Sequence, residues 1–383
     1  MAIYKDTTKT KDGRCWYYAC YKKDNLGNNK LYKSKKYKTK TEALEAERLF
    51  LMIRDNPIHK PFVLVADAYF DHIEHTKRTS TYISYLGVYN KNIKPFFEKY
   101  NIDDINVTVL NNWKQETQKK GFAKNYLNKL YNILNSIFKY ACSNYGMTYN
   151  PVQLSGGFES ADDHVKKDAD KLRYISLEDF NKLISIIEDI TWKTFFITLF
   201  YTGMRKAEIQ ALKITDIDFD NNEIIVDKTL SQSYNGYKIT KTKNSINRKI
   251  KMSVTLRKQL EEYINYIKNY SDFSKKWFLF GCSRYMPRTT IDRYKNYYFK
   301  LYNTTHEDKI KEISIHEFRH SHVSLLINEF VKSSKEKHIK VDSGKFFIMM
   351  SNRLGHTVET MQRVYMHLFP TIQDEIVDLL DNL

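Results

Sequence analysis

Residues 314–322 read Ser-Ile-His-Glu-Phe-Arg-His-Ser-His and place three imidazoles around one arginine. Six of the 11 histidines of the chain lie between His316 and His367, and Tyr365 falls in the same region. An earlier segment, Thr-Gly-Met-Arg-Lys-Ala-Glu at 202–208, adds a second arginine on what reads as a loop entering a helix. Arginines, histidines, lysines and a late tyrosine are the groups that metal-free phosphodiester chemistry requires.

The same stretch also spells a zinc-protease motif, because His316, Glu317 and His320 match His-Glu-x-x-His. On a helix this spacing would hold a metal between two imidazoles, with the glutamate as base. Arg319 stands between the two candidate ligands, and its charge would repel a dication. The extended motif also needs glycine where Val323 stands. The sequence therefore favours a site without a metal or any other cofactor.

Composition points to a polyanionic partner. The 383 residues suggest two or three domains. A formal net charge of +17 favours DNA or RNA first and an anionic membrane surface second, while a basic protein that binds neither is the alternative. Only Cys15 and Cys20 of the four cysteines are close in sequence, which argues against a disulfide framework. No apolar run approaches the ~18 residues of a membrane span, so we expect a soluble intracellular protein.

Residues 1–55 combine aromatic strands with many cations. The segments 16–21 and 31–37 are typical of strands, and a helix is expected from residue 42 after a cap at 39–41. A cationic sheet of this kind can lie on phosphates or enter the major groove of DNA, although a solvated lysine face is the alternative. The candidate DNA-binding residues are Arg14, Trp16, Tyr18, Lys33, Lys35 and Lys36.

Residues 62–155 carry apolar stripes at helical spacing and predict a four-helix domain. The clearest stripe contains Leu127, Leu130 and Leu134. Thr108 is the expected cap of another helix, which Gly121 would close. A polar segment without periodicity at 156–167 then marks a domain boundary.

Residues 172–383 predict a mostly helical domain with a small β-sheet. Ser176 and Ser253 are expected helix caps, and the apolar run 195–204 is typical of a central buried helix. Short strands are expected at 223–226, 237–240 and 248–252. The whole chain is therefore assigned to the α+β class, with several domains.

Phosphodiester chemistry gives each polar residue of this domain a candidate role. Arg205 and Arg319 can bind phosphate oxygens through planar forks, and His316 and His356 can add hydrogen bonds. Lys241, in a turn between strands, can give a proton to the departing oxygen. Tyr365 would be the nucleophile, and a cationic pocket would stabilise its phenolate.

In order and spacing these residues resemble the tyrosine recombinase (phage integrase) family. The resemblance rests on Arg205 within Thr-Gly-Met-Arg-Lys-Ala-Glu-Ile, the Lys-Thr-Lys turn at Lys241, His316-x-x-Arg319, Leu-Gly-His at 354–356, and Tyr365 nine residues later. It extends over nearly the whole chain. Residues 1–55 resemble the three-stranded arm-binding domain, 62–155 the helical core-binding domain and 172–383 the catalytic domain of integrases from phages and conjugative transposons.

The resemblance implies a site-specific DNA recombinase of a mobile element, in which Tyr365 forms a 3′-phosphotyrosyl bond without metal or ATP. Glu208 would orient Arg205, while His320 and His322 receive no role from the family and are interpreted as satisfied structural or surface histidines. Lys243 is an alternative to Lys241 as general acid. A catalytically silent DNA-binding regulator of the same fold is the alternative function, and type IB topoisomerases share the chemistry.

The resemblance also implies partners and a location. Double-stranded DNA would bind at core and arm sites, and an excision accessory protein is a further candidate partner. The acidic, apolar segment 371–383 is expected to pack on a neighbouring protomer in a tetramer on DNA, with packing on its own protomer as the alternative. The expected location is the bacterial cytoplasm, on DNA.

Overall fold

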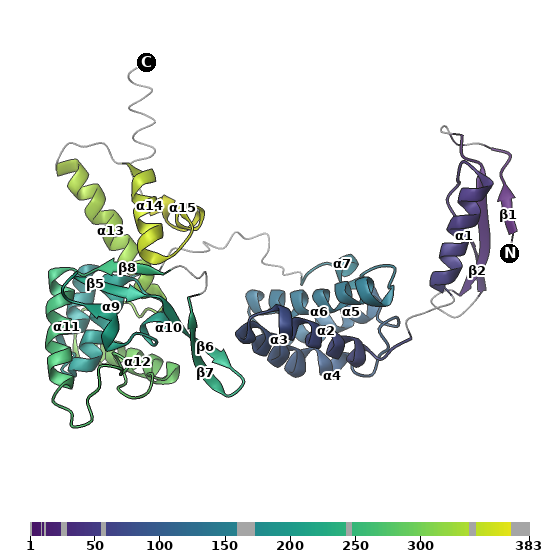
Figure 1. The fold of residues 1–383 in the computed structure, drawn as a ribbon. Coiled ribbons are helices and arrows are strands. Elements are labelled where there is room, and N and C mark those ends of the chain that lie inside the picture. Colours follow the sequence, from purple (N-terminus) through teal and green to yellow (C-terminus); the bar gives the residue numbers. More distant parts are fainter. Residues whose placement is uncertain are drawn as a thin grey trace, which may run out of the picture. The chain divides into compact units, whose positions relative to one another are not determined.

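The computed structural model divides the chain into two compact units, Met1–His164 and Val165–Leu383. Figure 1 shows the fold of each part, and the positions of the parts relative to one another are not determined. The residues that the structure describes are 2–8, 10, 13–23, 29–54, 59–158, 173–242, 247–336 and 342–368. No helix within these ranges is both long enough and apolar enough to cross a membrane.

The N-terminal part is a three-stranded antiparallel sheet with one helix. Its strands β1 (Ala2–Lys5), β2 (Trp16–Lys23) and β3 (Asn29–Lys33) follow the order β1-β2-β3. Helix α1 (Lys40–Arg54) lies along one face of the sheet (Figure 1). Because strand residues alternate between faces, Tyr18 and Cys20 of β2 point into this small core and are buried.

The helical part of the first unit contains four long helices, as the apolar stripes predicted. These are α2 (Phe62–Thr76), α3 (Thr79–Asn92), α5 (Val107–Gln118) and α6 (Lys124–Tyr145), with short helices α4 (Lys94–Phe97) and α7 (Pro151–Ser155). The expected cap Thr108 is wrong. Asn106 caps α5 instead, since its side-chain oxygen accepts a hydrogen bond from Val109 N at 3.1 Å.

The second unit is mostly helical. Its helices are α8 (Leu177–Ser185), α9 (Ile190–Thr202), α10 (Lys206–Ile209), α11 (Val254–Ile267), α12 (Arg288–Thr305), α13 (Glu317–Glu336), α14 (Ser343–Leu354) and α15 (Val358–Tyr365), with 3₁₀ turns at Ile214–Asp216 and Met366–Leu368. Ser176 and Ser253 cap α8 and α11 as predicted. Helix α9 is buried on nearly all sides and is the centre of this core.

Two small sheets accompany these helices. Strands β4 (Ile217–Asp218), β5 (Glu223–Val226) and β8 (Arg248–Lys251) form one sheet in the order β4-β5-β8. Strands β6 (Lys228–Ser233) and β7 (Gly236–Lys241) form a hairpin that extends away from the helices of its unit (Figure 1). The predicted α+β class, with a helical domain and small antiparallel sheets, is confirmed.

Two of the predicted site residues follow the C-terminal ends of helices. Helix α9 ends at Gly203 (φ +62°) and α14 ends at Gly355 (φ +65°), both in the left-handed conformation that glycine adopts without strain. Arg205 follows the first glycine by two residues, and His356 follows the second directly. The two glycines therefore turn the chain at the points where predicted site residues begin.

Candidate active site

Arg205 is held from two sides. It occupies the N-cap position of α10, where its Nη1 donates to Glu208 Oε1 at 2.8 Å and its main-chain N donates to Oε2 at 2.9 Å. Its Nη2 donates to the carbonyl oxygen of Gly355 at 3.0 Å. The side chain keeps 25% of its surface exposed, so the guanidinium is fixed in direction and still accessible. Glu208 orients this arginine, in the manner that the family resemblance implied.

Arg319 is a buried cation held by main-chain carbonyls. Its Nη1 donates to Gly203 O at 2.8 Å and its Nη2 to Leu354 O at 2.7 Å, which are carbonyls at the C-terminal ends of α9 and α14. Helix C-termini carry partial negative charge and suit a cation. Burial, and then the charge of Arg205, lowers the pKa of Arg319 to about 9, so the guanidinium stays charged at neutral pH.

Two imidazoles beside these arginines are neutral. Burial, followed by the charges of Arg319 and Arg205, lowers the pKa of His316 and lowers that of His356 to about 3. Within the described residues, two buried nitrogens have no hydrogen-bond partner here, His356 Nδ1 and Arg319 Nε. Leaving such groups unsatisfied is costly, so the pocket holds polar capacity that a ligand could use.

Tyr365, the predicted nucleophile, lies at the end of α15 with 1% of its surface exposed. Burial raises its pKa to about 12, although the charge of Arg319 acts in the opposite direction. Its hydroxyl oxygen lies 2.7 Å from Nδ1 of His320 on α13. His320, expected to be a satisfied structural or surface histidine, is half-buried, and this contact places one of its ring nitrogens at the predicted reacting atom.

Arg248 is a further residue that sequence reasoning missed. From β8 its Nη2 and Nη1 donate to Glu208 Oε2 and Oε1 at 2.7 and 3.2 Å, and its Nε donates to Arg353 O at 2.9 Å. Burial raises the pKa of Glu208, but Arg248 and then Arg205 overcome this effect and lower it to about 2. Glu208 is thus an ionised carboxylate shared by two arginines.

Lys241 is not brought together with these groups. It is exposed at the end of β7, opposite Lys228 of β6. Lys228 pairs with Asp216 at 2.6 Å and Asp227 at 2.8 Å, whereas the Lys241 side chain makes no hydrogen bond or ion pair to any residue in the described ranges. Lys243, the alternative general acid, lies outside the described residues, as does the segment 371–383.

The predicted DNA-binding residues of the N-terminal sheet differ in accessibility. Arg14, Lys33 and Lys35 are exposed, and Trp16 is half-buried with Lys5 over its ring at 5.5 Å. Lys36 pairs with Asp6 at 2.7 Å. Tyr18 is a correction: it is 5% exposed and faces α1 because it shares the inner face of β2 with Cys20. Tyr17, on the opposite face under Lys33, is the more accessible aromatic.

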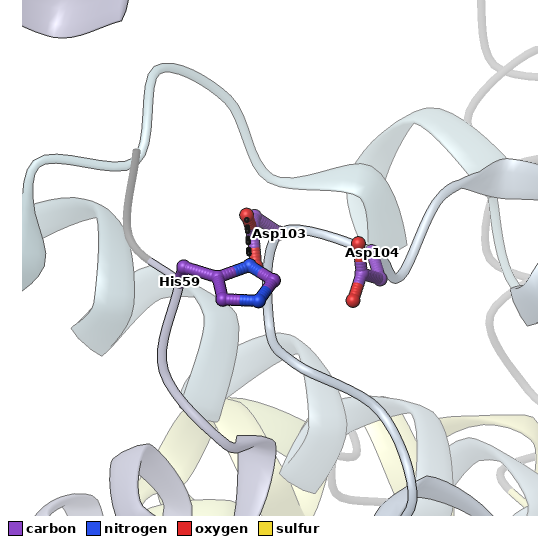
Figure 2. A group of neighbouring side chains, drawn as sticks. All are labelled: His59, Asp103 and Asp104. Carbon is purple, nitrogen blue, oxygen red and sulfur yellow. Dashed lines mark hydrogen bonds and ion pairs between the residues drawn. The ribbon is translucent and has the colours of Figure 1, made fainter. Parts of the chain in front are cut away.

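Within the described ranges one side-chain group has spacing suited to a metal ion, and it lies outside this site. Exposed His59, Asp103 and Asp104 form it (Figure 2). His59 Nδ1 already pairs with Asp103 Oδ2 at 3.3 Å, and Asn101 Nδ2 contacts both His59 Nε2 and Asp104 Oδ2. His316, Glu317 and His320 are not grouped in this way, so the geometry gives the zinc interpretation no support.

Comparison with known proteins gives the same picture. Residues 173–335 match the phage integrase family, and residues 62–118 match the phage integrase N-terminal SAM-like domain. The ICEBs1 integrase of Bacillus subtilis (strain 168) is 28% identical over 365 residues, 90% of each chain. A XerC-like tyrosine recombinase of Caldanaerobacter subterraneus subsp. tengcongensis is 27% identical over 286 residues, 68% of this chain and 71% of the relative.

Solved structures share the fold. The Tn1549 transposon integrase in complex with transposon right end DNA aligns with a TM-score of 0.66 and 20% identity, covering 82% of this chain and 99% of that one. A lambda integrase tetramer bound to a Holliday junction aligns with a TM-score of 0.55 and 15% identity over 93% and 91% of the two chains. The chain belongs to the phage integrase family and is a tyrosine-type site-specific recombinase.

Proposed function

We propose that this recombinase integrates and excises the DNA of a mobile element by forming a 3′-phosphotyrosyl bond through Tyr365. Arg205, Arg319, His316 and His356 bind the phosphate under attack. Residues 172–383 act as the catalytic domain, 62–155 bind core DNA, and 1–55 bind arm-type sites. The ICEBs1 and Tn1549 integrases, whose names connect them with mobile elements, support this assignment.

The observation that carries the proposal is the unused binding capacity of the pocket. Arg319 Nε and His356 Nδ1 are buried without a partner in the described structure, and Arg205 is aligned and one-quarter exposed. Two guanidinium groups and two neutral imidazoles suit an anion with several oxygens in one plane. The non-bridging oxygens of a phosphodiester gain charge during attack, so these donors stabilise the transition state more than the ground state.

In the proposed reaction the Tyr365 oxygen forms a bond to phosphorus and the bond from phosphorus to the 5′ oxygen breaks. Lys241 gives a proton to the departing 5′ oxygen, and the phenolic proton of Tyr365 leaves to a base. The ester keeps the bond energy, so a 5′-hydroxyl of another strand can reverse the step. Lys241 is exposed at the end of β7, where its ammonium is accessible to the departing oxygen.

Binding to double-stranded DNA and assembly of several copies are part of the proposal. The net charge of +17 favours DNA, and the lambda integrase structure is a tetramer on a Holliday junction. We assign the segment 371–383 to contacts between protomers and the protein to the bacterial cytoplasm. An excision accessory protein remains a candidate partner, tested by its effect on the excision reaction.

The decisive experiment uses nicked suicide duplexes built from the DNA flanking the coding sequence. Cleavage there releases a short strand and traps a covalent protein–DNA adduct, visible in a denaturing gel. We expect an adduct with the wild type, none with Tyr365→Phe, and no effect of a chelator. Failure of the wild type on all flanking sequences would contradict the proposal and favour a silent DNA-binding regulator, whereas loss of the adduct with chelator would favour a metal enzyme.

A further inference from the structure

We propose that His320 accepts the phenolic proton of Tyr365 during cleavage and returns it during religation. This inference rests on the proposed function and deepens it, because that reaction needs a base beside the tyrosine. The observation is the 2.7 Å separation between His320 Nδ1 and the Tyr365 hydroxyl oxygen, with the two rings inclined at 52°. Hydrogen-bond distance to the reacting atom is the first requirement for a general base.

The position of His320 on α13 makes this contact compatible with phosphate binding. His316 lies in the turn just before α13, four residues before His320, and the two imidazole ring centroids are 5.3 Å apart. Arg319 lies directly before His320 and binds the carbonyls that frame the pocket. The start of α13 and the residue just before it thus provide a proposed phosphate ligand, the buried arginine and the contact to the nucleophile.

The electrostatic surroundings leave His320 in its neutral form before DNA binds. Burial and then the neighbouring His316 lower its pKa to about 4, with Arg319 adding to the effect and Glu317 opposing it. Tyr365 faces it from α15 with a pKa raised to about 12 by burial. At neutral pH the pair is therefore a neutral imidazole and a neutral phenol. A DNA phosphate entering the pocket brings negative charge, which favours the imidazolium form.

The complete step balances in atoms and charge. Tyr365 oxygen forms its bond to phosphorus as its proton passes to His320 Nδ1. The bond to the 5′ oxygen breaks as Lys241 supplies a proton to that oxygen. In religation the 5′-hydroxyl attacks, its proton returns to Lys241, and His320 gives its proton to the departing phenolate. Neither metal nor a further reactant is required.

The alternative is that His320 only positions the hydroxyl, and two substitutions separate the roles. His320→Asn keeps an acceptor near the place of Nδ1 but cannot take a proton, while His320→Ala removes both functions. His367→Ala is the matched control, because His367 is exposed two residues after the nucleophile. Gel shift on the same duplex shows that each variant folds and binds DNA, and single-turnover adduct formation from pH 5.5 to 9.5 gives the rate.

For a proton acceptor we expect both substitutions to slow adduct formation at pH 7 on the order of 100-fold. The deficit should shrink as pH rises, because hydroxide replaces the lost base, and added imidazole should partly restore His320→Ala. A duplex with sulfur in place of the 5′-bridging oxygen should restore Lys241→Ala but not His320→Asn, since a thiolate leaves without a proton.

A His320→Asn rate within about 3-fold of wild type would overturn the inference, and so would rescue of this variant by the sulfur substrate. Both results leave the proposed function intact if the wild type forms the adduct and Tyr365→Phe does not. A wild type without an adduct would instead remove the proposed function, and this inference with it.

Discussion

Arg248 and Glu208 form a two-point ion pair inside the second unit, with Nη2 2.7 Å from Oε2 and Nη1 3.2 Å from Oε1. Their side chains are 4% and 2% exposed. The same carboxylate accepts a hydrogen bond from Arg205, so β8 is tied through Glu208 to an arginine of the proposed phosphate site. Arg248 therefore helps to fix the carboxylate that orients Arg205.

The first prediction concerns Arg248→Met, which removes one partner of this pair. Breaking a buried pair leaves a poorly compensated charge, and we expect the free energy of unfolding to fall by about 3 kcal/mol, with slower adduct formation. Urea denaturation followed by tryptophan fluorescence measures the loss. Lys249→Met is the matched control on the same strand, because the Lys249 side chain is 63% exposed and its pair with Glu223 should contribute at most ~1 kcal/mol. Equal effects of the two substitutions would contradict the argument.

The second prediction is a pH dependence. The pKa of Glu208 is about 2 in the folded chain, against 4.5 for the unperturbed group. A lowered carboxyl pKa stabilises the fold fully above pH 4.5, and this stabilisation is lost as pH falls through 4.5 towards 2. The difference in unfolding free energy between wild type and Glu208→Gln should be smaller at pH 3 than at pH 7 by about 2 kcal/mol. A difference in unfolding free energy that is independent of pH would rule out an ionised Glu208 in the folded chain.

Gly203→Ala is the third prediction. Gly203 has φ +62°, and an added Cβ would lie 2.7 Å from Leu354 Cδ2 and 2.8 Å from His322 Cδ2. Strain and overpacking together should cost about 2–4 kcal/mol of stability, and displacement of the Gly203 carbonyl should weaken the hold on Arg319. Gly344→Ala in α14 of the same unit meets only an ordinary contact at 3.4 Å. Gly344→Ala should be neutral or slightly stabilising. Scanning calorimetry of the wild type and the two variants measures both changes in stability.

Local signals explain which parts of the fold were predictable. Ser176, Ser253 and the apolar stripes of α6 could be recognised because caps and helical periodicity involve only neighbouring residues. The sequence pattern did not predict strands β1 and β6. β1 has four residues, and β6 reads Lys-Thr-Leu-Ser-Gln-Ser with weak apolar alternation. Both exist through pairing with β2 and β7, and composition does not show such pairing.

In the candidate site, too, local sequence signals were readable and contacts between distant residues were not. The prediction of a phosphate pocket came from the order of five residues along the chain: Arg205, His316, Arg319, His356 and Tyr365. The contacts of Arg248 with Glu208 span 40 residues, and that of His320 with Tyr365 spans 45. Neither partner can be identified without the fold. The four-residue spacing of His316 and His320 could be read from the sequence, but it was considered only as part of the zinc motif.

The fourth prediction tests the N-terminal sheet. Lys33 and Lys35 are exposed cations, and replacing both by alanine should weaken binding to arm-type duplexes at all sequences alike. If each neutralises one phosphate, the slope of log affinity against log salt should become shallower by about 0.9 per lysine. Lys40→Ala, an exposed position at the start of α1, is the control. An unchanged slope in the double variant would remove these lysines from the DNA interface.

The fifth prediction decides between Lys241 and Lys243 as general acid. Strand residues two positions apart share a face, so either ammonium can reach a scissile phosphate if the strand continues past β7. Alanine at the general acid should slow cleavage on the order of 100-fold on normal DNA, because the 5′ oxygen then leaves unprotonated. The 5′-bridging sulfur substrate should abolish that deficit, since a thiolate is a good leaving group. Only the variant that loses the acid should respond in this way, and a deficit that sulfur leaves unchanged would assign that lysine to phosphate binding instead.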